Sequence, residues 1–411
     1  MVSEHASPLA VPGGVDTGGQ NVHVAALATA VARLGHEVSV YTRRDDPGLP
    51  ERMPFGPGVT IEHVPAGPPE PIPRDDLLPW IPGFGQWLGE RWAAGPPDLV
   101  HSHFWMSGLA ALAGARDLGV PVVHTYHALG TVKRRHQGAD DTSPPQRIDA
   151  EMVIGRSVDA IIATCGDEVS ELLRMKIPRP VARVVPCGVD TDLFTPSSKN
   201  PGRPAHPRLL SLGRVVPRKG VETIIQALSN VKGAELVVAG GPFPDGLDAD
   251  PEVTRLRAEA ERAGVADRVR FLGRVPREEV PALIRSAHLT VCVPWYEPFG
   301  MVALESMACG VPVIASAVGG QKETVVNGVT GVLVPPRHPT ALTRALRRLL
   351  DDPLLRTAYG IAGADRARSR YGWPRIARET LAAYTRVLAA RGGPAEGTRG
   401  ERQETTARRA S

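Results

Sequence analysis

The segment Glu297-Pro-Phe-Gly-Met-Val-Ala-Leu-Glu305 carries two carboxylates around the start of a predicted helix, Met301–Ala308. Glu297 precedes the helix and Glu305 lies on it, so both could accept hydrogen bonds from sugar or ribose hydroxyls. The amides at the helix start point at whatever lies above the sheet. These amides belong to Phe299, Gly300, Met301 and Val302. The alternative is that Glu297 only caps the helix.

Two cations lie on the loop Gly213–Gly220, which directly follows a predicted strand. Arg214 offers a planar fork of donors and Lys219 a compact charge, and both could reach one diphosphate. The alternative is that they are solvated loop charges.

A glycine-rich segment, Gly13–Asn21, runs into a predicted helix. Gly18 and Gly19 would let backbone amides approach a phosphate closely, and the helix N-terminus favours anions. The alternative is a flexible turn. G-x-G-x-x-G is absent although Asp45 follows the next strand, which disfavours a nicotinamide-dependent oxidoreductase.

Four histidines stand near the ends of predicted strands: His101, His103, His124 and His127. No carboxylate or cysteine completes a metal site at ligand spacing. We therefore predict no metal site, with one histidine facing the ligand and the others packed.

Short apolar strands alternate with helices along the chain, which predicts an α/β fold with parallel sheets. We predict two doubly wound, Rossmann-like domains that face a central cleft, where ligands lie beyond the carboxyl ends of the strands. The expected boundaries are an N-terminal domain at 1–195, a linker at 196–207, a C-terminal domain at 208–370, a C-terminal helix at 371–391 and a disordered tail at 392–411. The predicted strands are Val38–Tyr41, Leu99–Val100, Val120–His124, Ala160–Thr164, Leu209–Leu212, Glu235–Ala239, Val269–Leu272, Leu289–Val293 and Val311–Ala315, and Gly360–Arg391 reads as one helical stretch.

The 411 residues carry a formal net charge of +4 with charges of both signs mixed, which argues against nucleic-acid binding. No apolar run is long enough for a membrane span, no signal peptide is visible and the 4 cysteines lie far apart, so we expect a cytoplasmic protein with free thiols. Val15–Gln20 resembles the loop after a first strand, for which only Met1–Val2 remain. We expect either a very short strand or a start upstream.

In order along the chain, Gly18-Gly19-Gln20-Asn21, His127-Ala-Leu-Gly, Gly213-Arg214 with Lys219-Gly220, and Glu297 with Glu305 resemble family 4 of the glycosyltransferases, which has the GT-B fold. The resemblance runs from residue 1 to about residue 390. It implies retaining transfer of a hexosyl group from a nucleotide diphosphate sugar, with UDP as the expected nucleotide, to a small polar hydroxyl acceptor. A magnesium ion is possible but not required, and the oligomeric state stays open.

The resemblance also implies that the domain at 1–195 binds the acceptor, that the domain at 208–370 binds the nucleotide sugar, and that the helix at 371–391 crosses back to the N-terminal domain. It further implies residue roles. Arg214 and Lys219 would bind the diphosphate, Glu297 and the helix amides the sugar, and Glu305 the ribose. His127 would contact the donor sugar. Val275 would touch the base, and Gly18 and Gly19 would make room for the diphosphate. The departing phosphate would deprotonate the acceptor, so no carboxylate nucleophile is needed.

On the acceptor side, the chain is similar to the branch that holds the D-inositol-3-phosphate glycosyltransferases and the sucrose-phosphate synthases. The expected acceptor residues are His5, Asp16, Gln20, Asn21, Arg74, Phe104, Lys133 and Arg147. Phe104 and Ala128 replace residues with hydroxyls in that pattern, which argues against inositol phosphate. An inositol-phosphate acceptor, a nucleotide-sugar epimerase and a non-catalytic sugar-binding protein stay as alternatives.

Overall fold

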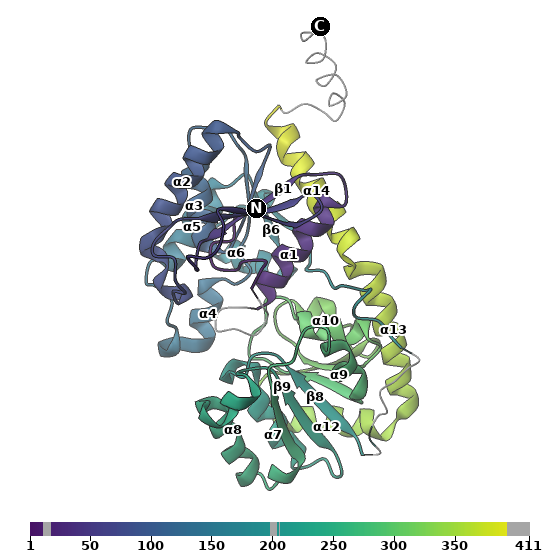
Figure 1. The fold of residues 1–411 in the computed structure, drawn as a ribbon. Coiled ribbons are helices and arrows are strands. Elements are labelled where there is room, and N and C mark those ends of the chain that lie inside the picture. The colour runs from purple at the N-terminus through teal and green to yellow at the C-terminus, as the bar shows by residue number, and fades with distance from the viewer. Residues whose placement is uncertain (11–17, 198–203, 205, 393–411) are drawn as a thin grey trace.

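A computed structural model describes residues 1–10, 18–197, 204 and 206–392 of the chain. Two α/β domains lie one above the other, and the last helices run along both (Figure 1). The two predicted Rossmann-like domains with parallel sheets are confirmed. Asp16, most of the predicted linker and nearly all of the predicted tail lie outside the described residues.

The sheet of the N-terminal domain has two parts, ordered β1-β3-β2 and β4-β5-β6-β7. Val2 forms parallel bridges to Tyr41 and Ser102 and so joins the two parts, in the place where a first strand is expected. The strands are β1 (Val38–Arg43), β2 (Arg52–Gly56), β3 (Val59–Val64), β4 (Val100–His103), β5 (Val122–Thr125), β6 (Ala160–Ala163) and β7 (Ala182–Val184). β2 runs antiparallel to β3, while the other paired strands are parallel.

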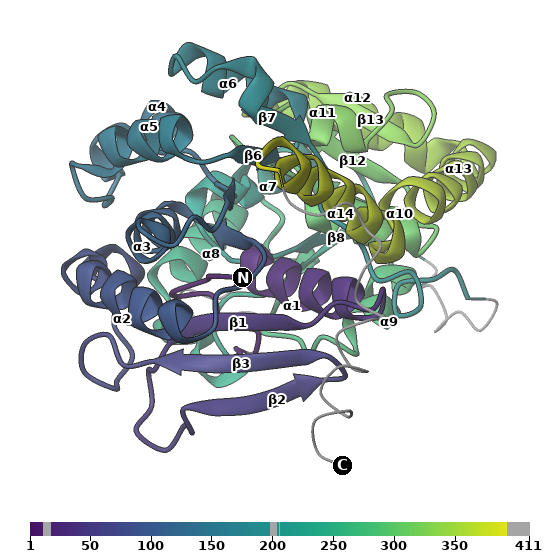
Figure 2. The same ribbon diagram turned by 90° about the horizontal axis from the view of Figure 1, so that it is seen from above.

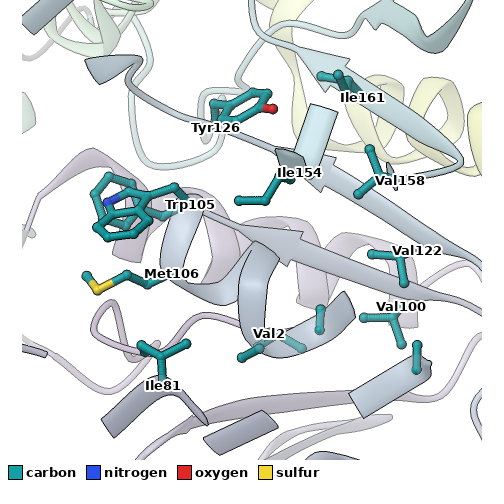
Figure 3. Close-up of a cluster of buried hydrophobic side chains, with 14 of the residues drawn as sticks. Val2, Ile81, Val100, Trp105, Met106, Val122, Tyr126, Ile154, Val158 and Ile161 are labelled. Carbon is teal, nitrogen blue, oxygen red and sulfur yellow. The ribbon is translucent and has the colours of Figure 1, made fainter. Parts of the chain in front are cut away.

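Helices cover both faces of this sheet (Figure 2). They are α1 (Gly19–Ala32), α2 (Ile81–Ala94), α3 (Trp105–Ala115), α4 (Gly130–Gln137), α5 (Arg147–Ser157) and α6 (Gly166–Arg174). α2, α3 and α5 enclose one core with Val100 and Val122 of the strands, and Figure 3 shows this cluster with Trp105, Met106 and Ile154. α1 encloses a second core on the opposite face.

The sheet of the C-terminal domain is parallel throughout, in the order β10-β9-β8-β11-β12-β13. The strands are β8 (Arg208–Leu212), β9 (Glu235–Ala239), β10 (Val269–Gly273), β11 (Leu289–Cys292), β12 (Val313–Ser316) and β13 (Gly331–Val334). The helices are α7 (Val221–Leu228), α8 (Pro251–Arg262), α9 (Val280–Ser286), α10 (Met301–Ala308), α11 (Gln321–Thr324), α12 (Pro339–Asp351) and α13 (Pro353–Tyr371). α7, α8 and α12 cover one face, and α9, α10 and α13 cover the other.

The single helical stretch predicted at Gly360–Arg391 is two helices, α13 and α14 (Trp373–Ala390). Gly372 between them has extended backbone, and Pro374 in the first turn of α14 removes an amide that a continuous helix needs. α14 returns to the N-terminal domain, where Ile376 and Ala377 join the core around α1.

Candidate active site

The loop after β8 brings Lys219 to the carboxyl end of β11. Gly220 has φ 75°, and a Cβ there would lie 2.1 Å from the carbonyl oxygen of Val293, so only glycine permits this approach. As a result, Lys219 Nζ donates to Glu297 Oε2 at 2.5 Å. The structure thus joins two of the predicted catalytic residues in an ion pair.

Glu297 is surrounded by positive charge. Burial raises its pKa, but Lys219, Arg218 and Arg214 more than offset this effect and hold the pKa below the ordinary value. The carboxylate is therefore ionised at neutral pH and accepts hydrogen bonds. The charge of Arg214 helps to lower the pKa of Glu297, and Arg214 also takes part in an interaction with another group.

The N-terminus of α10 lies directly beyond Glu297, with the bounds that the sequence predicts. Gly300 precedes the helix with φ 92°, so it turns the chain without the strain that a side chain would bring. The Glu297 carboxylate accepts from Lys219 Nζ rather than from an amide at the start of α10, which does not support the capping alternative. A Cβ at Gly320 would lie 2.7 Å from Phe299 Cα, so the following loop packs tightly against this turn.

Gly19 brings the N-terminal domain to the same helix end. A Cβ at Gly19 would lie 3.1 Å from Met301 Sδ, which makes this contact tight for any other residue. The Gly18–Gly19 segment and the start of α10 therefore face each other across the domain junction. Gln137 Nε2 also donates to Tyr296 Oη at 2.8 Å across this junction.

Glu305 is buried on α10 and forms an ion pair with Arg277 at 2.6 Å. Burial raises the pKa of Glu305, and Arg277 opposes this effect. The guanidinium of Arg277 also lies 4.6 Å from the centroid of the Phe194 ring. Sequence reasoning missed Arg277, although it lies only two positions after the predicted Val275.

The histidines form one cluster on the N-terminal domain. His103 Nδ1 lies 3.0 Å from His127 Nε2, and His23 of α1, which sequence reasoning missed, joins them. Burial lowers the pKa of His23 to about 4 and those of His103 and His127 well below the ordinary value, so the rings are neutral.

His127 has φ 59°, a left-handed conformation that is uncommon for a residue with a side chain. It is also partly exposed, whereas His101, His103 and His124 are buried. Ligand nitrogens of His23, His103 and His127 lie within 4.8 Å of one another. The sequence prediction that no metal is held here stays a prediction.

The described members of the predicted acceptor set lie on the N-terminal domain, and Asp16 lies outside the described residues. The guanidinium carbons of Arg74 and Arg147 lie 5.7 and 5.0 Å from the centroid of the Phe104 ring. The centroid of the His5 ring lies 4.9 Å from the same point, with the two rings in a T-shaped arrangement. The other described members take part in local hydrogen bonds: Gln20 to the carbonyl of His103, Asn21 to the carbonyl of Ser7, and Lys133 to Ser143.

The sequence matches two profiles that adjoin near the domain boundary: "Glycosyltransferase Family 4" over residues 17–193 and "Glycosyl transferases group 1" over residues 196–366. The D-inositol 3-phosphate glycosyltransferase of Frankia alni is 37% identical over 409 residues, covering 94% of this chain and 98% of that protein. The chain therefore belongs to the group 1 glycosyltransferases.

Further comparisons agree with this assignment. The D-inositol 3-phosphate glycosyltransferase of Streptomyces avermitilis is 36% identical over 413 residues, covering 95% of this chain and 88% of that protein. The solved structure of sucrose-phosphate synthase from Thermosynechococcus elongatus is 33% identical with a TM-score of 0.88, covering 95% of this chain and 98% of that one. The GT-B fold expected from the resemblance is confirmed.

The described part of the glycosyltransferase contains no helix with the length and apolar character that crossing a membrane requires. Its four cysteines are free thiols in the structure.

Proposed function

We propose that this glycosyltransferase is a retaining enzyme that moves a hexosyl group from a UDP-linked sugar to a hydroxyl of a small polar acceptor in the cytoplasm. The observation that carries the proposal is the position of Lys219, on the β8–α7 loop, against Glu297 at the start of α10. A cation and a carboxylate that can accept hydrogen bonds from hydroxyls thereby lie at the carboxyl ends of adjacent parallel strands, where α/β domains bind ligands.

In this proposal the bound donor replaces the ion pair between Lys219 and Glu297 with one contact to each of the two residues. The diphosphate takes the charge of Lys219, and Glu297 then accepts a hydrogen bond from the donor sugar. The fork of Arg214 reaches the same phosphates. As the bond between the sugar C1 and the diphosphate oxygen breaks, negative charge develops on the leaving group, and both fixed cations stabilise it.

The backbone makes room for the donor. Gly19 lies against the Met301 side chain, so the backbone of the glycine segment comes close to the N-terminus of α10, where the helix amides favour an anion. Glu305 accepts from the ribose hydroxyls, and its ion pair with Arg277 opposes the rise in pKa that burial causes. Val275 contacts the base of the nucleotide.

The acceptor oxygen then bonds to C1 on the face that the leaving group departs, and its proton passes to the departing phosphate oxygen. This step keeps the anomeric configuration and needs no enzyme nucleophile, unlike the carboxylate of a retaining glycosidase. His127 is neutral and partly exposed, so it serves as a hydrogen-bonding contact for the sugar.

A ligand that binds the native state raises the apparent stability, so thermal unfolding with UDP, GDP and ADP tests the donor. We expect UDP to give the largest shift, and Arg214→Ala to abolish it. Release of UDP from a UDP-sugar on addition of an acceptor then tests transfer, with the product's anomeric configuration read by NMR. No shift with any nucleotide, or an inverted product, would contradict the proposal.

A second candidate acceptor is D-inositol 3-phosphate. It is favoured by the relatives at 36–37% identity, whose names specify that substrate. D-inositol 3-phosphate carries a negatively charged phosphate, whereas an unphosphorylated polar acceptor does not. The charges on the acceptor side of the site therefore discriminate between the two candidates.

A further inference from the structure

Each cation on the acceptor side has a carboxylate of this chain as a partner. Lys133 Nζ lies 3.0 Å from Asp141 and 3.6 Å from Asp75. Arg74 Nε lies 3.1 Å from Asp75, so Asp75 bridges the two cations. These positive charges are therefore balanced before any ligand binds.

The pairs with Lys133 are largely shielded from water. The Lys133 and Asp141 side chains are 13% and 6% exposed, and that of Asp75 is 21% exposed. Burial raises the pKa of Asp75, but Thr142, Arg74 and Lys133 outweigh this effect and lower it to about 2. Ser143 and Lys133 likewise lower the pKa of Asp141 despite its burial. Both carboxylates are thus ionised at neutral pH.

Arg147 is engaged even more fully. Its side chain is 2% exposed, Nε donates to Glu151 at 2.8 Å, and a terminal nitrogen donates to the carbonyl of Ala128 at 2.7 Å. Glu151 also accepts the amide of Gly130, which fixes the start of α4. Arg147 is thus bound into the scaffold by strong charge-assisted bonds.

Phe104 lies between the cations. Its ring is close to the guanidinium groups of Arg74 and Arg147, and it has no hydroxyl to donate. Phe104 is 3% exposed and precedes α3 with φ 78°, so its place is fixed by the backbone. The Phe104 ring thus offers Arg74 and Arg147 a cation–π contact, and the ring itself carries no charge.

A phosphate on the acceptor must compete with these carboxylates. A phosphate offers only acceptor oxygens, so to reach Lys133 or Arg74 it must displace an aspartate or lie beside one, and in either case it meets the repulsion of an aspartate that remains. A neutral polyol both donates and accepts. Its hydroxyls can bond to an aspartate and to a cation at once, and the ion pairs stay intact.

We propose that the acceptor is an uncharged polyol or sugar, and that Asp75 and Asp141 exclude phosphorylated acceptors by neutralising Lys133 and Arg74. The inference rests on the proposed transferase function for the identity of this side of the site. It assigns a selectivity role to two aspartates that sequence reasoning did not single out.

The experiment compares the wild type with Asp75→Asn/Asp141→Asn and with a matched control, Asp76→Asn/Asp140→Asn. The control aspartates are direct neighbours, exposed, and change the net charge by the same amount. Inorganic phosphate is the probe because it carries the charge without requiring a particular polyol. Binding is measured by calorimetry with saturating UDP, which blocks the diphosphate site, and thermal unfolding checks that each variant folds.

We expect weak phosphate binding by the wild type and the control, and binding about tenfold tighter by Asp75→Asn/Asp141→Asn, equivalent to about 1.4 kcal/mol. Equal binding by the double variant and the control would overturn the inference. Tight phosphate binding by the wild type would do the same.

Transfer assays give a second readout. The wild type should use uncharged polyols in preference to their phosphates, D-inositol 3-phosphate included, and the double variant should narrow this preference about tenfold. A wild type that prefers D-inositol 3-phosphate to inositol would refute the inference while supporting the proposed transferase. If UDP fails to bind the wild type, the proposed function falls, and the phosphate titration without UDP still decides whether the aspartates exclude the anion.

Discussion

The donor and acceptor sides use the same residue types in different proportions. On the donor side, the carboxylate of Glu297 lies in the field of Lys219, Arg218 and Arg214, so cations outnumber carboxylates around Glu297. On the acceptor side, Lys133 and Arg74 share Asp75 and Asp141. The count of cations therefore says little about the charge of a ligand, whereas the partners of those cations say a great deal.

This difference has a functional meaning. An excess of positive charge suits a diphosphate leaving group, since charge that develops in the transition state finds fixed cations. A balanced set of charges suits hydroxyls and penalises a second anion. The following changes test whether the two sides differ in this way.

The largest effect is expected for Lys219→Ala. Loss of a fixed cation at the leaving group should lower turnover about 100- to 1,000-fold. Lys232→Ala, which removes an exposed lysine in the same domain, should leave turnover near the wild-type value. The measurement is steady-state release of UDP. Similar rates for the two variants would show that Lys219 does not stabilise the leaving group.

Glu297→Gln separates binding from catalysis. Loss of a charge-assisted hydrogen bond to the sugar should lower turnover about 10- to 100-fold. UDP lacks the sugar, and removal of the carboxylate releases Lys219 for the diphosphate, so UDP should bind at least as tightly as to the wild type. Calorimetry with UDP measures this affinity. Weaker UDP binding would mean that Glu297 supports the diphosphate site rather than the sugar.

A smaller effect concerns acid stability on the acceptor side. The pKa of Asp75 is about 2 against an ordinary value of 3.8, so its ionised form is favoured by folding. Because the folded-state pKa is the lower one, this stabilisation is present above about pH 4 and is lost as the pH falls towards 2. Asp75→Asn should flatten the fall of melting temperature over that range, while Asp76→Asn should not. An unchanged pH profile in Asp75→Asn would contradict the ion-pair network.

No effect is expected from removal of metal ions. If the cations alone carry the diphosphate charge, EDTA should leave transfer unchanged and added magnesium should not raise it. A loss of activity in EDTA that zinc restores would instead point to His23, His103 and His127, whose nitrogens lie close together. His23→Phe would then identify the site, since it should remove the response to zinc.

The donor side was largely predictable from sequence because its residues lie in short segments with strong local signals. Met301–Ala308 was predicted with its observed bounds, and the glycine at position 300 marks the helix start. Lys219 and Glu297 follow neighbouring strands of one parallel sheet, so their meeting follows from the topology.

The partners on both sides were harder to predict. Arg277 reaches Glu305 from a separate loop, and Asp75 reaches Lys133 across more than fifty residues, so neither pair has a local signal. His101 and His103 were expected at a strand end, yet β4 continues through them because their rings find partners in the interior. The edge strands β2, β7 and β13 were missed because they are short and partly exposed. β3 was missed as well, although it lies between β1 and β2 and is largely buried.

The return of α14 to the N-terminal domain has a consequence for the order of synthesis. Ile376, Ala377 and Val387 complete the same core as Val24 and Leu27 of α1, although they are among the last described residues to be made. A growing chain on the ribosome carries an open apolar surface on α1 until nearly the whole protein has emerged. The first domain to be translated is thus the last to be finished.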